Sequence, residues 1–120
     1  MEFNNNSPIY TQIVEFFKSK IASGGYAPGD RVESVRELSL SMEVNPNTMQ
    51  RAMSELERDG YLYSERTSGR YITKNTELID SLKYGLIENI LDNFINEMSA
   101  IGIKKNEIIR LLQKKLDEKE

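Results

Sequence analysis

The sequence predicts a mainly helical fold (α+β class) in which a winged helix-turn-helix is followed by a two-helix extension. Three observations lead to this prediction. Two short amphipathic helical patterns, separated by a tight turn, occupy residues 34–59. A β-hairpin pattern follows at residues 61–73, and strongly apolar helical patterns fill residues 77–118. We therefore expect a first domain at residues 1–75 and a helical hairpin at residues 76–120.

An amphipathic helix opens the first domain. Pro8 suits its first turn, and Ser7 is the expected N-cap. Apolar residues then recur at helical spacing: Ile9, Ile13, Phe16, Phe17 and Ile21. We interpret this stripe as core packing rather than as a binding site. Gly24-Gly25 ends the helix, and Pro28-Gly29-Asp30 is typical of a turn that leads into a short extended segment at residues 31–33.

The first helix of the helix-turn-helix begins with a capping box. The Ser34 hydroxyl can accept from the backbone amide of Glu37, and the Glu37 carboxylate can accept from the amide of Ser34. We expect a helix over residues 34–42. Glu43-Val44 then forms the turn before the second helix.

The second helix has a cap at each end and two distinct faces. Asn45 is a good N-cap, Pro46 fits the first helical position, and Gly60 stops the helix. Its apolar face consists of Met49, Ala52, Met53 and Leu56. The opposite face carries Asn47, Arg51, Ser54 and Arg58, flanked by Thr48 and Gln50. Asn, Gln and Arg are suited to read base edges, although polar residues opposite an apolar stripe also occur on ordinary surface helices.

The hairpin decides between these interpretations. Two β-prone runs, residues 61–65 and 70–73, flank Thr67-Ser68-Gly69. Arg66 and Arg70 are expected near the tip, where they can contact phosphate or a minor groove. A plain surface hairpin is the alternative, but its place directly after a helix-turn-helix favours a wing.

Several sequence blocks, in order and at regular spacing, resemble a known family. They are Ser7-Pro-Ile-Tyr-Thr-Gln-Ile, the segment from Ile21 to Leu38, the segment from Val44 to Gly60, and Arg66-Thr-Ser-Gly-Arg-Tyr-Ile. Together they resemble the N-terminal domain of the GntR family of bacterial transcription regulators over residues 7–73. Asn-Pro-Asn-Thr-Met-Gln-Arg-Ala, from Asn45, is similar to the YtrA-type branch of small regulators.

The resemblance implies a winged helix that binds a palindromic operator in double-stranded DNA as a homodimer. Position by position, it implies these DNA contacts: Arg36, Asn45, Asn47, Thr48, Gln50, Arg51, Arg66, Ser68, Gly69 and Arg70. Two departures bear on the bases that are read. Pro46 stands where many members carry a basic residue, and Gln50 stands where many carry arginine. We expect Gln50 to shift the preference toward adenine if it contacts a base.

The amino-acid composition excludes further classes of function. The chain of 120 residues has no cysteine and no histidine, which removes disulfides, thiolate nucleophiles and the commonest general base. We expect no enzyme, no cofactor and no metal site. No long apolar run or signal peptide is present, so we expect a cytoplasmic protein without a membrane segment.

The net charge of −3 is unusual for a nucleic-acid-binding protein. Residues 1–73 carry eight Lys/Arg and ten Asp/Glu. Non-specific affinity for DNA is therefore expected to be weak. The basic residues that matter must be placed locally, and the acidic ones must face away from the duplex.

The pattern of apolar residues in the C-terminal tail, residues 76–120, predicts a protein–protein interface. Helical patterns at about residues 77–100 and 104–118 carry an apolar surface wider than one stripe, which a helix pair cannot bury alone. We expect a symmetric dimer formed through Leu82, Leu86, Ile90, Phe94, Ile109 and Leu112. The alternative is a tail packed only on its own domain. A small-molecule effector between aromatic residues such as Tyr84 and Phe94 stays open.

These inferences favour a sequence-specific DNA-binding transcription regulator, with a repressor as the specific hypothesis. The alternative is a winged-helix protein-interaction module without a specific DNA target. A protein-binding face would carry exposed aromatic or aliphatic residues near its centre. The polar residues Asn47, Gln50 and Arg51 argue against that alternative.

Overall fold

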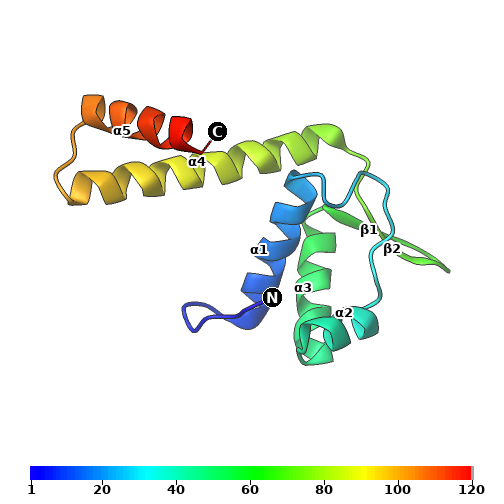
Figure 1. The fold of residues 1–120 in the computed structure, drawn as a ribbon. Helices are drawn as coiled ribbons and strands as arrows, with labels where there is room; N and C mark the ends of the chain where they lie inside the picture. Colours follow the sequence, from blue (N-terminus) through cyan, green and yellow to red (C-terminus); the bar gives the residue numbers. More distant parts are fainter. Residues whose placement is uncertain (120) are drawn as a thin grey trace. The chain divides into compact units, whose positions relative to one another are not determined.

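The computed structural model describes residues 1–119 and confirms a mainly helical winged helix-turn-helix fold (Figure 1). The elements are α1 (Ile9–Ala22), α2 (Val35–Met42), α3 (Pro46–Arg58), β1 (Leu62–Glu65), β2 (Gly69–Ile72), α4 (Thr76–Ala100) and α5 (Lys105–Glu118). The chain divides into two compact units, Met1–Lys83 and a second that begins at Tyr84. The division falls inside α4.

The core of the first unit forms where α1 packs along α3 (Figure 1). Helix α2 and strand β1 also contact α3, so α3 is enclosed on one side by three elements. The largest fully buried side chains come from α1, α3 and the hairpin with the segment beside it: Ile13, Phe17, Ile21, Met49, Met53, Leu56, Leu62, Ile72 and Val32. The predicted apolar face of α3 is thus confirmed as the centre of the core.

Helix α1 starts one residue later than the sequence indicates. Pro8, with an extended ψ of 147°, occupies the N-cap position, and no side chain caps the helix. The prediction that Ser7 is the N-cap is therefore wrong. The Gln12 side chain instead holds the preceding segment, because its Nε2 donates to the carbonyls of Asn4 and Ser7, both at 2.9 Å.

Local hydrogen bonds fix the helix-turn-helix as expected. The Glu37 amide donates to Ser34 Oγ at 3.1 Å, and the Ser34 amide donates to Glu37 Oε1 at 3.3 Å, which completes the capping box. Asn45 Oδ1 accepts from the Asn47 amide at 2.7 Å at the start of α3. Glu43 has a left-handed φ of 56° in the turn. These contacts set the start of α3 relative to α2.

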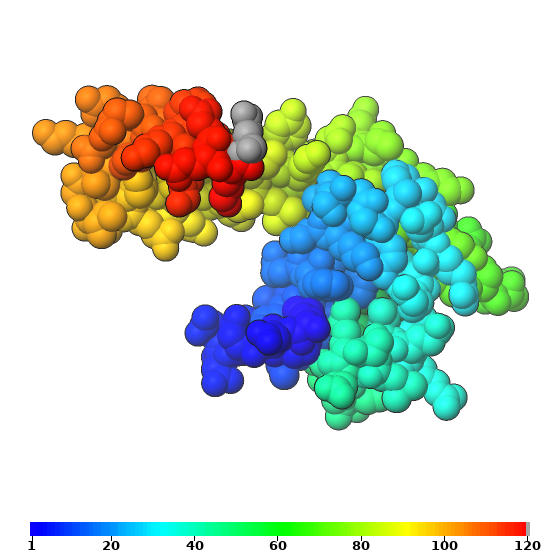
Figure 2. Space-filling model, viewed as in Figure 1, coloured from blue at the N-terminus to red at the C-terminus, as the bar shows by residue number. Residues whose placement is uncertain are grey.

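The strands of the hairpin differ by one residue from those predicted: β1 begins one residue later, and β2 begins and ends one residue earlier. Leu62 pairs with Ile72 and Glu65 pairs with Gly69, which leaves a three-residue turn at residues 66–68. Gly69 has a φ of 112°, a conformation that other residues rarely adopt. The expected extended segment lies alongside, since Arg31 forms a bridge with Tyr71. The hairpin projects from the first unit in the space-filling view (Figure 2).

The second unit contains the end of α4 and α5, joined by a short loop. Gly102 in this loop has a φ of 84°, and the Ile103 amide donates to the Met98 carbonyl at 3.0 Å. Apolar residues of these helices remain at the surface: Ile87, Ile90, Leu91, Ile95, Ile109, Leu112 and Leu116. Among residues 1–119, no helix combines the length and the apolar character needed to cross a membrane.

The two neighbouring phenylalanines of α1 give a test of the core. Phe17 is 0% exposed, whereas Phe16 is only half-buried. We expect Phe17→Ala to lower the free energy of unfolding by about 3–5 kcal/mol, because it removes a fully enclosed ring and leaves a cavity. Phe16→Ala should cost clearly less. Urea denaturation of both variants measures the difference, and equal losses would contradict the placement of the core.

Candidate nucleic-acid interface

The exposed face of α3 carries the residues that the sequence indicated. Asn47, Gln50, Arg51 and Ser54 are all exposed, whereas Thr48 is half-buried. Gln50 Nε2 donates to Ser54 Oγ at 3.0 Å, one helical turn further on. These side chains lie opposite Met49, Ala52, Met53 and Leu56, which are each 0% exposed. The polar face is therefore held outward by the burial of the other face.

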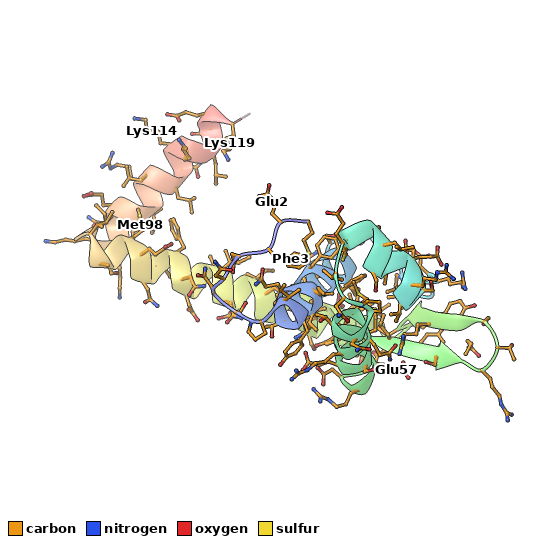
Figure 3. The ribbon with its side chains drawn as sticks, turned by 90° about the horizontal axis from the view of Figure 1, so that it is seen from below. Glu2, Phe3, Glu57, Met98, Lys114 and Lys119 are labelled. Atoms are coloured by element: carbon orange, nitrogen blue, oxygen red, sulfur yellow. The ribbon has the colours of Figure 1, made fainter. Side chains whose placement is uncertain are left out.

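The wing is tied to α3 through Glu57 (Figure 3). One carboxylate oxygen of Glu57 accepts from Arg70 Nε at 2.9 Å and from Ser64 Oγ at 2.8 Å. These two donors come from β2 and β1, so one side chain contacts both strands. The hydrogen bond from Arg70, followed by that from Ser64, lowers the pKa of Glu57 from its ordinary value of 4.5. The contact fixes the angle between the wing and α3.

This ion pair changes the expected state of Arg70. The sequence placed Arg70 near the hairpin tip, but it lies within β2 and its side chain is 22% exposed. Arg66 instead stands in the turn and is exposed. The tip is supported by a residue that sequence reasoning did not single out: Arg31 Nε donates to the Ser68 carbonyl at 2.9 Å. The guanidinium of Arg31 also lies next to Gly69.

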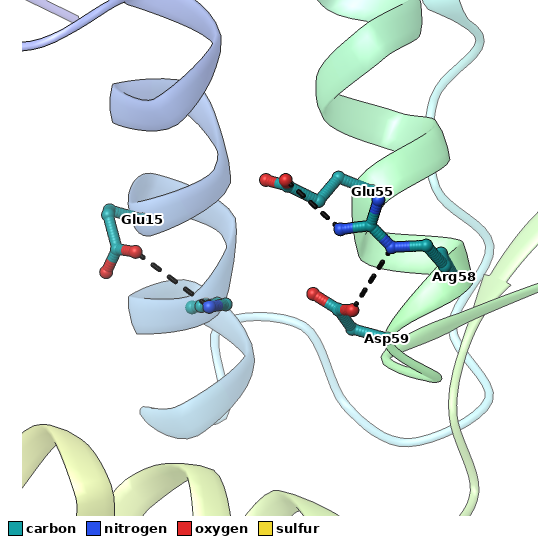
Figure 4. Close-up of polar contacts among 5 residues, drawn as sticks. Glu15, Glu55, Arg58 and Asp59 are labelled. Carbon is teal, nitrogen blue, oxygen red and sulfur yellow. Dashed lines mark hydrogen bonds and ion pairs between the residues drawn. The ribbon is translucent and has the colours of Figure 1, made fainter.

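Carboxylates near the end of α3 are paired with neighbouring cations (Figure 4). Arg58 contacts Glu55 at 3.3 Å and Asp59 at 3.5 Å. Lys18 contacts Glu15 on α1 at 3.8 Å. Arg58 is thus committed to acidic partners, which neutralise its charge locally.

Three arginines of the candidate interface carry no such pair. Within residues 1–119, Arg36, Arg51 and Arg66 lie in no ion pair with a carboxylate, and all three are exposed. Arg36 lies in the first turn of α2, close to the start of that helix. Arg51 packs over the ring of Tyr10 from α1, with its guanidinium carbon 3.7 Å from the ring centroid. These side chains keep their positive charge available to an anionic partner.

The candidate dimerisation residues differ in exposure. Leu82 is 8% exposed, so it is buried within its own chain, and it belongs to the first unit. Leu86 and Phe94 are half-buried. Ile90 and Ile109 are 66% and 71% exposed, and Leu112 is also exposed. The surface available to a partner is therefore concentrated beyond the start of the second unit.

A groove of about 370 Å³ runs between α4 and α5 of the second unit. It is lined by Phe94, Met98, Leu111, Leu112, Lys114, Lys115 and Glu118. Met98 and Lys114 are labelled in Figure 3. Tyr84 lies elsewhere on α4 and is 70% exposed. No group of three or more His, Cys, Asp or Glu side chains able to hold a metal ion occurs in residues 1–119.

Together, α2, α3 and the hairpin define the class of this protein. A helix with a buried apolar face and an exposed Asn/Gln/Arg face, set after a short helix and beside a hairpin, is a DNA-binding winged helix-turn-helix. The description "Bacterial regulatory proteins, gntR family" matches residues 9–72. The chain belongs to this family, whose members are transcription regulators and not enzymes.

Individual proteins of the family extend the similarity. The chain is 36% identical to the HTH-type transcriptional repressor YtrA of Bacillus subtilis, over 83% of this chain and 78% of YtrA. A structure of a GntR family transcriptional regulator from Listeria monocytogenes is 42% identical, covers 93% of this chain and 98% of its own, and gives a TM-score of 0.86. The AraR DNA-binding domain in complex with operator ORR3 is 26% identical over 61% of this chain and 88% of its own, with a TM-score of 0.54.

Sequence reasoning missed contacts that join distant segments. The sequence predicts that acidic residues such as Glu57 face away from DNA and that Arg31 belongs to an extended segment, but it does not predict which residues they contact. Their partners lie on other elements, such as Ser68 for Arg31. Helical periodicity shows which face is exposed, but it does not show which neighbour lies beside that face.

The lowered pKa of Glu57 gives a pH-dependent prediction. Because the folded-state pKa of Glu57 lies below its ordinary value of 4.5, the Glu57 contacts stabilise the fold above that pH, and this contribution is lost as pH falls through the folded-state pKa. We expect Glu57→Gln to lower the melting temperature near neutral pH and to have progressively less effect as the pH falls below the ordinary pKa of glutamate. Thermal unfolding across this range measures the effect.

The matched control is Glu88→Gln, which changes an exposed carboxylate of α4 that forms no ion pair within residues 1–119. It should leave the melting temperature nearly unchanged at each pH. A Glu57→Gln effect of constant size across the pH range would contradict the assignment.

Proposed function

We propose that this transcription regulator is a repressor that binds a palindromic operator as a homodimer. In this proposal α3 lies in the major groove, and the wing contacts the adjacent backbone or minor groove. The observation that carries the proposal is the exposed face of α3, where Asn47, Gln50 and Arg51 stand over a fully buried apolar face.

Each proposed contact follows from position and chemistry. Asn47 and Gln50 carry a donor beside an acceptor, and Arg51 carries paired donors, all of which suit base edges. Asn45 and Thr48 at the start of α3 suit phosphate or base edges. Arg36 on α2 and Arg66, Ser68 and Gly69 at the tip suit backbone contacts. Arg70 reaches DNA only as part of its pair with Glu57, which reduces its expected share of phosphate binding.

Electrostatics favour a specific over a general DNA binder. The net charge is −3, so long-range attraction to DNA is weak. The pairs Glu57–Arg70 and Glu55–Arg58 neutralise acidic side chains near the C-terminal end of α3. The unpaired charges of Arg36, Arg51 and Arg66 then act at short range, where hydrogen-bond geometry decides affinity.

Similarity supports the operator and the repressor role. YtrA of Bacillus subtilis is named a transcriptional repressor, and the AraR domain is in complex with an operator. A repressor needs no surface beyond its DNA-binding and dimerisation surfaces, since occupying the operator blocks polymerase. The cytoplasmic location expected from the sequence is consistent with this role.

The proposed dimer rests on the exposed apolar surface of the second unit. Ile90, Ile109 and Leu112 lie on α4 and α5 and remain accessible, and a second copy is an economical way to cover them. A symmetric dimer also places two copies of α3 on successive faces of the major groove, about 34 Å apart. The groove that Phe94 and Met98 line is the place in this unit where an effector would most readily fit.

The alternative, a protein-interaction module, requires an apolar centre on the exposed face of α3. Five of the six exposed residues of α3 are polar or charged, namely Asn47, Gln50, Arg51, Ser54 and Arg58, and the sixth is Pro46 at the start of the helix. Exposed aliphatic residues of this domain lie outside α3: Leu40 on α2, at 72% exposure and beside Val35 and Val44, and Ile9 on α1. The face of α3 therefore favours DNA over protein as its ligand.

The operator can be recovered by selecting bound fragments from a random DNA pool. We expect inverted half-sites about 10 base pairs apart, or a multiple of this spacing. Arg51→Ala should then weaken binding to the recovered site by about 1–3 kcal/mol and relax the base preference at one position. Arg110→Ala, which removes an exposed arginine of α5, is the matched control and should bind normally. If no common sequence were recovered, the proposal of a sequence-specific operator would be refuted.

The dimer has its own test. We expect sedimentation at micromolar concentration to give twice the mass of one chain. Ile90→Glu and Ile109→Glu should each yield monomers, because a carboxylate in an apolar interface is costly to desolvate. Leu40→Glu changes an equally exposed aliphatic residue outside the tail and should stay dimeric. A wild-type monomer would refute the role given to the second unit.

A further inference from the structure

One contact at the edge of α3 has a geometry suited to recognition. The guanidinium carbon of Arg51 lies 3.7 Å from the centroid of the Tyr10 ring, well inside the range of a cation–π contact. The two other contacts of this kind are looser, with Lys20 at 4.3 Å from Tyr26 and Lys18 at 5.8 Å from Tyr61. At 3.7 Å the planar guanidinium packs directly on the ring.

We propose that Tyr10 is a positioning residue for Arg51, which holds the guanidinium in the orientation that reads a base. The inference rests on the proposed function, in which Arg51 contacts the operator. Tyr10 itself touches no base in this proposal. It acts by limiting the orientations of Arg51 before DNA arrives.

The chemistry of arginine makes such positioning effective. Its N–H donors lie in the plane of the guanidinium, whereas stacking on an aromatic ring uses only a face. Tyr10 can therefore hold Arg51 without occupying the donors that would bind a guanine or a phosphate. A long side chain loses rotamer freedom on binding, and a side chain that is already held loses less.

The ring of Tyr10 is itself well placed. Tyr10 lies in the first turn of α1, is half-buried, and precedes Ile13, which is 0% exposed in the core. Gln12, two residues on, holds the N-terminal segment by donating to the carbonyls of Asn4 and Ser7. Because α1 packs on α3, the position of Tyr10 relative to Arg51 is fixed.

The arrangement also gives α3 a support on each edge. At about 100° per residue, Arg51 falls toward the side of α3 that meets α1, and Glu57 falls toward the other side. Glu57 bonds both strands of the wing there. Recognition residues such as Asn47 and Ser54 lie between these two supports. Tyr10 therefore supports Arg51 at one edge of α3, and Glu57 supports the wing at the other edge.

A double-mutant cycle on the selected operator tests the inference. Wild type, Tyr10→Leu, Arg51→Ala and the double variant are compared by equilibrium binding. We expect Tyr10→Leu to weaken binding about two- to fivefold, the size of an exposed cation–π contact. It should have no further effect in the Arg51→Ala background. Tyr10→Phe should bind as wild type, because the ring alone makes the contact.

Base preference is a second measurement, which a purely structural role would not change. Tyr10→Leu should relax the preference at the same base pair as Arg51→Ala, whereas Tyr61→Leu, the control aromatic of the same domain, should relax none. Melting temperatures show whether each variant is folded. If Tyr10→Leu is not, Tyr10→Met takes its place in the cycle, since it keeps a similar apolar volume.

The outcomes separate this inference from the proposed function. Arg51→Ala without effect on operator binding would overturn both. A loss for Arg51→Ala with no loss for Tyr10→Leu would overturn only the role of Tyr10. Equal losses for Tyr10→Leu in both backgrounds would show general packing and overturn it as well. Tighter binding by Tyr10→Leu would mean that the stack restrains Arg51 from DNA, which is also contrary to the proposal.

Discussion

The packing of α3 against α1 is the constraint on which the rest of the structure depends. Met49, Ala52, Met53 and Leu56 are each 0% exposed, and this burial fixes the rotation of α3 about its own axis. The polar side chains of the opposite face, such as Asn47 and Gln50, are therefore exposed. A small error in that rotation would move Arg51 away from Tyr10 and Glu57 away from the wing.

The same packing resolves the conflict between an acidic chain and an anionic ligand. Two carboxylates of α3 are paired with arginines: Glu57 with Arg70, and Glu55 with Arg58. Each pair neutralises an arginine that would otherwise attract DNA. The cations that remain, such as Arg51, are few, so their exact placement matters more than the total charge.

Local chemistry in the sequence is enough to predict most of the fold. The capping box of Ser34, the Asn45 cap and the hairpin depend on residues only a few positions apart, and the structure confirms them. Pairings over longer separations were not predictable. Arg31 meets the Ser68 carbonyl across 37 positions, and Arg70 meets Glu57 across 13. Such contacts depend on how elements pack, which periodicity does not encode.

The C-terminal helices α4 and α5 show how this limit of periodicity affects the functional interpretation. Periodicity correctly indicates that the apolar surface of α4 and α5 is too wide for one helix pair, and Ile90 and Ile109 indeed stay exposed. It does not distinguish Leu82, which is buried in the first unit, from Ile90 two turns later. Leu82 belongs to the same unit as the DNA-binding domain, whereas Ile90 lies in the second unit. In the proposed dimer, residues of α4 would therefore belong both to the unit that reads the operator and to the unit that contacts the partner.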